Sequence, residues 1–348
     1  MKPALDIGGR MVGADHEPFV IAEMSANHLG QIERAHALVD AAADAGCDAL
    51  KLQTFTPASM TLDTHEGNFT IAGGPWGGRS LWDLYSEAHT PWEWHAELFA
   101  HGKARGLVMF STPFDEEAVM RLDALGAPVF KIASFELVDL ELVACAARTN
   151  KPLIMSTGMA SDAEVAEAIE TALANGNGGV ALLHCISGYP APIDQTNVRR
   201  MDAIAKHGTV VGVSDHSPGS IVPITCVARG GSIIEKHLTL ARRDGGPDAG
   251  FSLEPNEMLD VVRGAKLAWK ALGDGSAKRP KAEEGSRRFR RSLYAVADIA
   301  EGQPLTRENV RSIRPGYGLP PRELPTIMGR TAKTTITRGT PLAWELIA

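Results

Sequence analysis

The stretch SIIEKHLTL, Ser232–Leu240, begins as a short apolar β-strand and then presents Glu235, Lys236 and His237 in succession. Charged side chains are rarely buried, so three ionisable residues in a row are unusual for a core strand. Side chains alternate between the two faces of a strand, which places Glu235 and His237 on one face and Lys236 on the other. The pattern predicts a strand end that points functional groups inward, with Lys236 facing a helical layer and its role open.

Seven further apolar, β-rich runs precede this stretch, and each is followed by a helical pattern. One such pattern is DAEVAEAIETALANG, which follows Ser161 as an N-cap and ends at Gly176. Alternating strands and helices predict a parallel sheet covered by helices. The seven runs are FVIAEMS from Phe19, ALKLQTF from Ala49, LVMFSTP from Leu107, VFKIAS from Val129, PLIMSTG from Pro152, VALLHC from Val180 and TVVGVSDH from Thr209.

Eight such units and a last helix in NEMLDVVRGAKLAWKALG predict an α/β fold, a closed (β/α)8 TIM barrel, for residues 1–273. An open doubly wound sheet is the alternative, but no G-x-G-x-x-G motif follows the first strand to support a dinucleotide fold. Residues 274–290 are polar and charged and predict a solvated linker, with a basic patch for a polyanion as the alternative. Residues 291–348, in which DIAEGQPL and TITRGTPL are similar turn units, predict a small separate domain.

Composition narrows the function classes. The 348 residues carry a net charge of -7, which argues against a nucleic-acid or acidic-membrane binder. The four cysteines are widely spaced and form no C-x-x-C pair, as is typical of reduced thiols in a cytosolic protein. The N-terminus lacks the apolar run of a signal peptide, and no apolar run approaches about 18 residues. We expect a soluble, cytoplasmic protein.

Polar residues recur at the ends of the predicted strands, where the chemistry of a barrel of this class is carried. Alternation places several of them on common inward faces, such as Glu23 with Ser25 and Ser214 with His216. Single hydroxyls could simply cap strands, but polar inward residues on all eight strands indicate a site. The other strand-end residues are Lys51, Gln53, Thr112, Lys131, Ser134, Glu136, Ser156, His184 and, just beyond the sixth strand, Tyr189.

Lys51 and Lys131 lie inside predicted strands, where a lysine needs an anionic partner or a lowered pKa. Together with nearby hydroxyls they predict a site for a phosphate or carboxylate. A Schiff-base lysine is the alternative. The hydroxyls are those of Thr112, Ser134, Ser156 and Ser214.

His216 and His237 end neighbouring predicted strands, which lie about 4.8 Å apart, so the two imidazoles can share one divalent metal. Few other protein ligands are in reach, which predicts an open catalytic site with Mn²⁺, for which Mg²⁺ or Zn²⁺ could substitute. Two core histidines bonded to backbone are the alternative. The long loop from Thr56 to about Thr90 contains Trp76 and is typical of a lid over the site.

Ten motifs, in order along nearly the whole chain, resemble the sialic acid synthase family. They are FVIAEMSANH, DALKLQTF, FSTPF, KIASFE, MSTGM, HCISGYPAP, GVSDHS, IIEKHLTL, GGPDAGFSLEP and IRPGYG. The resemblance implies a (β/α)8 barrel followed by a small antifreeze-like (SAF, β-clip) domain. It implies a transferase that condenses phosphoenolpyruvate with an N-acetylated amino sugar and water to give a nine-carbon acid and phosphate. It also implies a divalent metal, usually Mn²⁺, and a homodimer whose SAF domain covers the partner's active site.

The resemblance assigns roles residue by residue. It makes His216 and His237 the metal ligands and Glu23 the acidic residue near the reacting carbons. Arg314, in IRPG, becomes the SAF-domain residue that reaches the partner's sugar site. Sugar- or site-lining positions are Gln53, Glu136, Tyr189 and Asp248, and phosphoenolpyruvate-binding positions are Lys51, Thr112, Lys131, Ser134, Ser156 and Ser214.

The segments LWDLYSEAHTPWEWH and RRFRRSLYAVADI are most similar to the pseudaminic acid synthase branch, whose acceptor is 2,4-diacetamido-2,4,6-trideoxy-L-altrose. Ser187 stands where N-acetylneuraminate synthases commonly carry Asn, which counts against N-acetylmannosamine. N-acetylneuraminate or legionaminate remain alternative products. More remote alternatives are a metal-dependent sugar aldolase or isomerase, and a non-enzymatic ice- or glycan-binding module.

Overall fold

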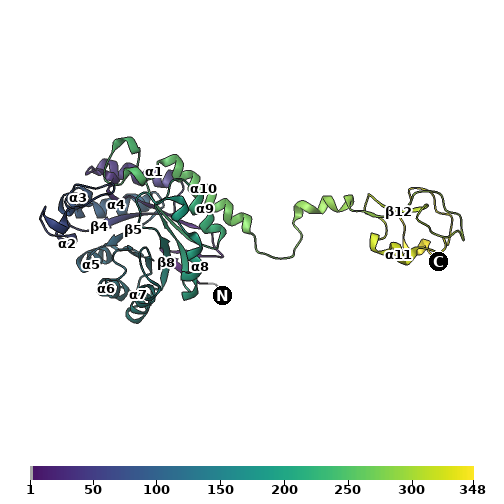
Figure 1. Cartoon of the computed structure of the whole chain (residues 1–348), viewed down its shortest axis with the longest axis horizontal. Coiled ribbons are helices and arrows are strands. Elements are labelled where there is room, and N and C mark those ends of the chain that lie inside the picture. Colours follow the sequence, from purple (N-terminus) through teal and green to yellow (C-terminus); the bar gives the residue numbers. More distant parts are fainter. Residues whose placement is uncertain (1–2) are drawn as a thin grey trace. The chain divides into compact units, whose positions relative to one another are not determined.

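The computed structural model describes residues 3–348, which divide into two compact units between Gly273 and Asp274. In the first unit eight parallel strands close into a barrel in which β10 pairs with β3, and helices surround the strands (Figure 1). The predicted (β/α)8 fold is therefore confirmed. The barrel strands are β3 (Phe19–Glu23), β4 (Ala49–Thr54), β5 (Val108–Pro113), β6 (Phe130–Ile132), β7 (Leu153–Ser156), β8 (Val180–Cys185), β9 (Val210–Asp215) and β10 (Ile233–His237).

The covering helices begin and end where the capping residues indicate. Helix α7 (Asp162–Asn175) has Ser161 as its N-cap, in a capping box with Glu164, and Gly176 follows its last turn. The other helices of this unit are α1 (Ile32–Asp44), α2 (Pro57–Met60), α3 (Leu81–Ala88), α4 (Trp92–Ala104), α5 (Glu116–Leu125), α6 (Leu140–Arg148), α8 (Met201–Ile204), α9 (Ile221–Ala228) and α10 (Pro255–Leu272).

A hairpin that the sequence patterns do not predict closes the N-terminal end of the barrel. Strands β1 (Ala4–Ile7) and β2 (Arg10–Gly13) pair antiparallel, and the turn between them places Gly8 and Gly9 at positive φ. Ile7 and Val12 are fully buried against inward apolar side chains of the barrel strands. The lower half of the barrel is thus a packed core, and the polar residues are confined to the opposite end.

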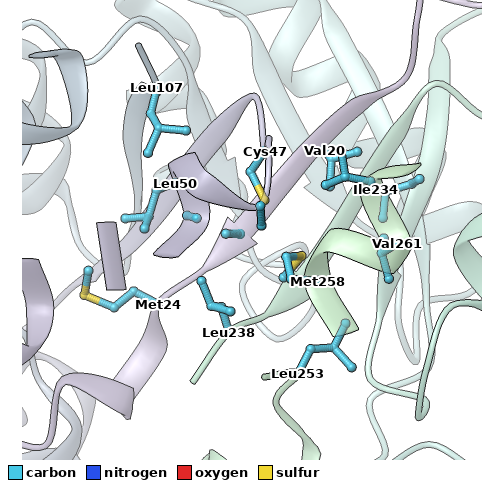
Figure 2. Close-up of a cluster of buried hydrophobic side chains, with 14 of the residues drawn as sticks. Val20, Met24, Cys47, Leu50, Leu107, Ile234, Leu238, Leu253, Met258 and Val261 are labelled. Carbon is cyan, nitrogen blue, oxygen red and sulfur yellow. The ribbon is translucent and has the colours of Figure 1, made fainter. Parts of the chain in front are cut away.

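A second core lies between the strands and the helices. Val20 of β3 and Ile234 of β10 pack beside Met258 and Val261 of α10 (Figure 2). All four side chains are fully buried, which fixes the outer face of each strand. Because side chains alternate along a strand, the residues between these apolar positions must point into the barrel.

The second unit is small and mostly irregular. Its named elements are β11 (Ser292–Ala295), β12 (Val310–Ile313) and the short helix α11 (Leu324–Ile327), and residues Lys281–Phe289 form a 3-10 helix. The two similar turn units pair with each other, because Ile299 and Ile336 exchange two backbone hydrogen bonds of 2.8 Å. Leu293, Ile299 and Ile336 belong to its own buried core. Along residues 3–348, no helix combines the length and apolarity needed to cross a membrane.

Gly212 of β9 tests how tightly the barrel is closed. A β-carbon there would collide with the carbonyl oxygen of Ile233 on β10. We expect Gly212→Ala to lower the free energy of unfolding by about 1–3 kcal/mol, the usual cost of overpacking, measured by urea denaturation. Gly73→Ala is the control, since its β-carbon meets nothing within 4 Å. Equal stability of the two variants would contradict the close strand approach.

Candidate active site

Strand register brings the first acidic group of the site between a lysine and a histidine. Glu23 ends β3, where its register partners are Lys51 on β4 and His237 on β10. One pleat deeper, Glu235 of β10 is paired in register with Ser214 of β9. These five side chains therefore gather at the C-terminal end of the barrel, as expected for inward strand-end residues.

Lys51 lies at the centre of this group. Its ammonium contacts the carboxylate of Glu23, donates a 2.9 Å hydrogen bond to Thr112 Oγ1 and lies 3.6 Å from Glu235 Oε1. Ser214 Oγ donates to the same oxygen of Glu235 at 3.3 Å. Lys51 and the two glutamates are all buried, so each charge depends on the others for stabilisation.

The two carboxylates differ in their protonation. Burial raises the pKa of Glu23 to about 7, although Lys51 opposes the shift. Burial also acts on Glu235, but Lys131 and Lys51 outweigh it and hold the pKa of Glu235 below its ordinary value. For Lys51, burial disfavours the charged form, yet Glu23 and Glu235 outweigh it and raise the pKa. One carboxylate is thus held ionised while the other can exchange a proton near neutral pH.

Lys131 is the lysine with room for an anion. Its ammonium donates to Ser156 Oγ at 2.7 Å and to the Ile132 carbonyl at 3.1 Å, and it forms no ion pair within residues 3–348. Burial lowers its pKa. Glu235 stabilises the ammonium from beyond ion-pair distance, and a bound anion would add a direct charge partner.

Hydroxyls and a close-packed glycine lie beside this lysine. Ser134 Oγ accepts a 3.1 Å hydrogen bond from the Gly158 N–H. A β-carbon at Gly158 would lie 2.5 Å from Ser187 Oγ and 2.7 Å from Ser134 Oγ, so a larger residue there would displace these hydroxyls. Backbone N–H groups and hydroxyls in such an arrangement suit phosphate oxygens.

The two predicted metal ligands face each other. The rings of His216 and His237 are 5.3 Å apart between centroids. His216 Nδ1 lies 3.1 Å from the Ile186 carbonyl, which favours a proton on Nδ1 and leaves Nε2 as the free electron pair. His237 Nδ1 is buried and has no hydrogen-bond partner. A buried ring nitrogen without a partner fits a ligand position for a metal.

Electrostatics also bears on the metal ligands. Burial, together with the nearby His216 and Lys51, lowers the pKa of His237 well below its ordinary value, so its ring is neutral, as metal binding requires. Burial acts the same way on His216, but the adjacent Cys185 outweighs it and raises that pKa. Across the described chain, no group of three His, Cys, Asp or Glu side chains is arranged to hold an ion. The two imidazoles would therefore be the protein's share of an open site.

The remaining sugar-lining candidates are also partly or fully buried. The carboxylate of Asp248 accepts a hydrogen bond from the Ser25 hydroxyl, and burial raises its pKa. Burial likewise raises the pKa of Glu136 to about 7, and its Oε2 is buried without a partner. Gln53 is half-buried on the inward face of β4, opposite Thr112.

An aromatic cluster covers the histidines. The ring of Tyr189 lies 4.4 Å from that of His216, and Phe251 lies 5.0 Å from both Tyr189 and His237. Trp76, from the long loop after β4, lies 5.4 Å from Tyr189 and donates from Nε1 to the Pro247 carbonyl at 2.8 Å. The loop thus contributes a ring directly above the site, where apolar parts of a substrate would make contact.

The structure places His184 differently from the prediction and adds two residues to the site. The prediction that His184 points inward is wrong: Ala181 and Leu183 fill the barrel interior, and His184 Nε2 bonds the Thr196 carbonyl at 2.7 Å outside it. The inward residue at the end of β8 is Cys185. Phe251 is a site residue that no pattern singled out, although an aromatic residue within GGPDAGFSLEP was a usable signal. Arg314 is exposed in the second unit.

Known proteins share this chain's two-part organisation. A profile of the NeuB family matches residues 38–277, and a profile of the SAF domain matches residues 290–348. This chain belongs to the NeuB family. The predicted resemblance and the SAF assignment of the second unit are therefore confirmed.

Relatives of this NeuB-family chain include biosynthetic enzymes. Pseudaminic acid synthase of Helicobacter pylori is 40% identical and spans 94% of this chain and 96% of its own length. N,N'-diacetyllegionaminic acid synthase of Campylobacter jejuni is 33% identical, over 90% and 95% respectively. The crystal structure of N-acetylneuraminic acid (sialic acid) synthetase from Leptospira borgpetersenii, in complex with citrate, matches with a TM-score of 0.74 at 28% identity, covering 82% of this chain and 95% of that one. The chain is an enzyme of the sialic acid synthase type.

The raised pKa of Glu136 predicts an effect on stability. The folded protein binds this proton more tightly than the unfolded chain, so the stabilisation is full below pH 4.5 and is lost as the pH rises through about 7. We expect Glu136→Gln to match the parent at pH 4 and to exceed it at pH 8 by on the order of 2 kcal/mol in urea denaturation.

The control for this prediction is Glu164→Gln. Hydrogen bonds from Ser161 lower the pKa of Glu164, so its contribution to stability is present above pH 4.5 and lost below it. This variant should be less stable than the parent at pH 8. A Glu136→Gln protein that shows the same direction at pH 8 would contradict the buried, partnerless state of Glu136.

Proposed function

We propose that this enzyme is a pseudaminic acid synthase. It would condense phosphoenolpyruvate with 2,4-diacetamido-2,4,6-trideoxy-L-altrose and water, giving the nine-carbon acid and phosphate. The observation that carries the proposal is that one barrel end holds a buried lysine without a direct ion pair and two neighbouring histidines, in a chain 40% identical to a pseudaminic acid synthase. The alternative products, legionaminate and N-acetylneuraminate, require the same chemistry on a different acceptor.

The reaction forms a C–C bond to the sugar and a C–O bond to water, and it breaks the C–O bond to phosphate. C3 of phosphoenolpyruvate attacks the aldehyde carbon of the open-chain sugar, whose oxygen takes a proton and becomes a hydroxyl. Water adds to C2, and phosphate leaves by cleavage of the C2–O bond. Lys131 and the hydroxyls of Ser134 and Ser156 would bind the phosphate and hold C3 against the aldehyde, which makes the step effectively unimolecular.

Glu23 is the group best suited to handle the water proton. Its pKa of about 7 lets it accept a proton at neutral pH and return it within one turnover. Lys51 holds the carboxylate in place from one side, and Glu235 keeps Lys51 charged from below. The competing Schiff-base role needs a neutral lysine. The raised pKa of Lys51 disfavours it at that residue, whereas the lowered pKa of Lys131 leaves it open there.

Enzymes of this family are generally metal-dependent, and the histidine pair fits a divalent cation. His216 and His237 would hold it, and Mn²⁺ suits imidazole ligands completed by water and substrate oxygen. When bound there, such a cation supplies Lewis-acid polarisation of the acceptor's aldehyde oxygen. The aromatic rings of Trp76, Tyr189 and Phe251 would contact the acetamido methyls and the C6 methyl of the acceptor.

We also propose a homodimer in which each SAF domain completes the partner's site. The support is the exposure of Arg314, a guanidinium suited to acceptor oxygens. The free state of the four cysteines supports a cytoplasmic location.

Acceptor choice is tested by phosphate release from phosphoenolpyruvate with Mn²⁺ and a panel of sugars. We expect the diacetamido altrose to give a kcat/KM at least about tenfold above other diacetamido sugars and N-acetylmannosamine, since one altered contact in a pocket is worth about 1–3 kcal/mol. Preference for another panel member reassigns the product within the family. Turnover without phosphate release would instead favour the aldolase or isomerase alternative.

The proposed dimer is tested by subunit complementation. Arg314→Ala and His237→Ala variants should each be nearly inactive alone, because each damages both sites of its own dimer. Coexpression allows mixed dimers with one intact site, so activity should return to about a quarter of the parent level for random two-fold pairing. If the coexpressed mixture stays as inactive as its parts, Arg314 does not act across the dimer.

A further inference from the structure

A second buried ion pair lies directly behind the histidines, on the outer face of the same two strands. Asp215 precedes His216 on β9, Lys236 precedes His237 on β10, and the two are register partners. Lys236 Nζ lies 2.9 Å from Asp215 Oδ2, with side-chain exposures of 0% and 3%. Alternation puts this pair toward helices α9 and α10 while the histidines point into the barrel.

The pair also holds the backbone on both sides of His216. Lys236 Nζ donates to the Ser217 carbonyl, and the Ser217 N–H donates to Asp215 Oδ1 at 2.9 Å. The histidine backbones are held from elsewhere as well: the carbonyl of His216 accepts from the Ala191 N–H at 3.1 Å. The last residue of β9 and its turn are therefore tied to β10 by side-chain contacts rather than by strand pairing alone.

Stability does not account for this arrangement. Removing two charges from water is costly, and apolar residues of similar size are commonly as stabilising as a buried ion pair. The outer layer of these strands is largely apolar, with Val213 and Ile234 in its core, although Glu257 also acts on the Lys236 ammonium. An apolar pair would therefore suit most of this layer. The best-attested use of a buried polar contact is to fix one register among several.

We infer that Asp215 and Lys236 form a positioning pair that sets the direction of His216 and His237 before a divalent cation binds. The inference rests on the metal site proposed above. In metal sites, groups that orient the ligands commonly change metal affinity by about 10- to 100-fold when removed. Here the orientation is transmitted through one peptide unit on each strand.

Another ion pair of the barrel provides a matched control. Arg10 contacts Asp48, and Asp48 Oδ2 accepts from the Val20 N–H at 2.8 Å, just as Asp215 accepts from Ser217. This second pair lies at the closed end, beside the β1–β2 hairpin, away from the histidines. Its loss should affect folding but not the metal site.

The experiment compares Mn²⁺ binding by the full-length, chelator-stripped chain, measured by titration calorimetry without substrates. The variants are the double substitutions Asp215→Asn/Lys236→Met and Arg10→Met/Asp48→Asn, with His237→Ala as the reference for a lost ligand. We expect the first double variant to bind Mn²⁺ about 10- to 100-fold more weakly than the parent. The control pair should lower the melting temperature and leave the affinity within about twofold, as a purely structural contact would.

The possible outcomes distinguish a wrong metal site from a wrong positioning role. If the parent does not bind Mn²⁺, or His237→Ala binds it equally well, the proposed metal site is wrong. If the parent binds and His237→Ala does not, but the Asp215→Asn/Lys236→Met protein binds like the parent, the positioning role is overturned and the metal site stands. An equal loss of affinity in both double variants would overturn the positioning role as well.

A measurement on the unmodified chain covers the case in which the double variant does not fold. Hydrogen exchange of the metal-stripped protein should show the amides of residues 213–217 and 234–238 as protected as those in the middle of the barrel strands, with little change on adding Mn²⁺. Protection that develops only after Mn²⁺ is added would mean that the ion orders the strand ends, and would overturn the inference.

Discussion

A lysine inside a closed barrel can stay charged only if carboxylates reach it, and the rest of this site depends on that requirement at Lys51. Parallel pairing in register delivers Glu23 from the neighbouring strand β3, and β10, the next strand beyond β3, supplies Glu235. The same register then decides where the histidines stand, because His237 is opposite Glu23. A slip of one residue in β10 would turn Glu235 and His237 outward and bring Lys236 in, so charge pairing and ligand placement are a single constraint.

The two inward lysines differ in their charge partners, and this difference makes the site asymmetric. Lys51 is neutralised by its own protein, whereas Lys131 is bonded only to a hydroxyl and a carbonyl. The two carboxylates differ in protonation as well. Glu235 is held ionised, whereas Glu23 is near its titration midpoint at neutral pH. A site with one satisfied pair, one cation without a direct ion pair and one exchangeable proton is asymmetric in the manner that acid–base chemistry on an anionic substrate requires.

Period-2 and helical patterns are enough to predict the eight strands, the caps of α7 and the inward direction of Glu235 and His237, because these follow from local alternation. These patterns fail where the arrangement is decided by tertiary packing. The β1–β2 hairpin is too short for a periodic signal, and the role of its apolar residues is evident only against the barrel floor. His184 and Cys185 are adjacent, and only the register of β8 shows that the thiol faces in. The contact between Ser25 and Asp248 spans more than two hundred residues, beyond any local pattern.

The β1–β2 hairpin across the N-terminal end of the barrel has a consequence for how substrates enter and products leave. With Ile7 and Val12 packed into the floor, the barrel has one mouth, and both substrates and both products must share it. A substrate bound nearer the floor is covered by one bound nearer the mouth. The packed end of the barrel, which the hairpin and the strands' own apolar side chains close, therefore constrains the order in which substrates can enter although it carries none of the chemistry.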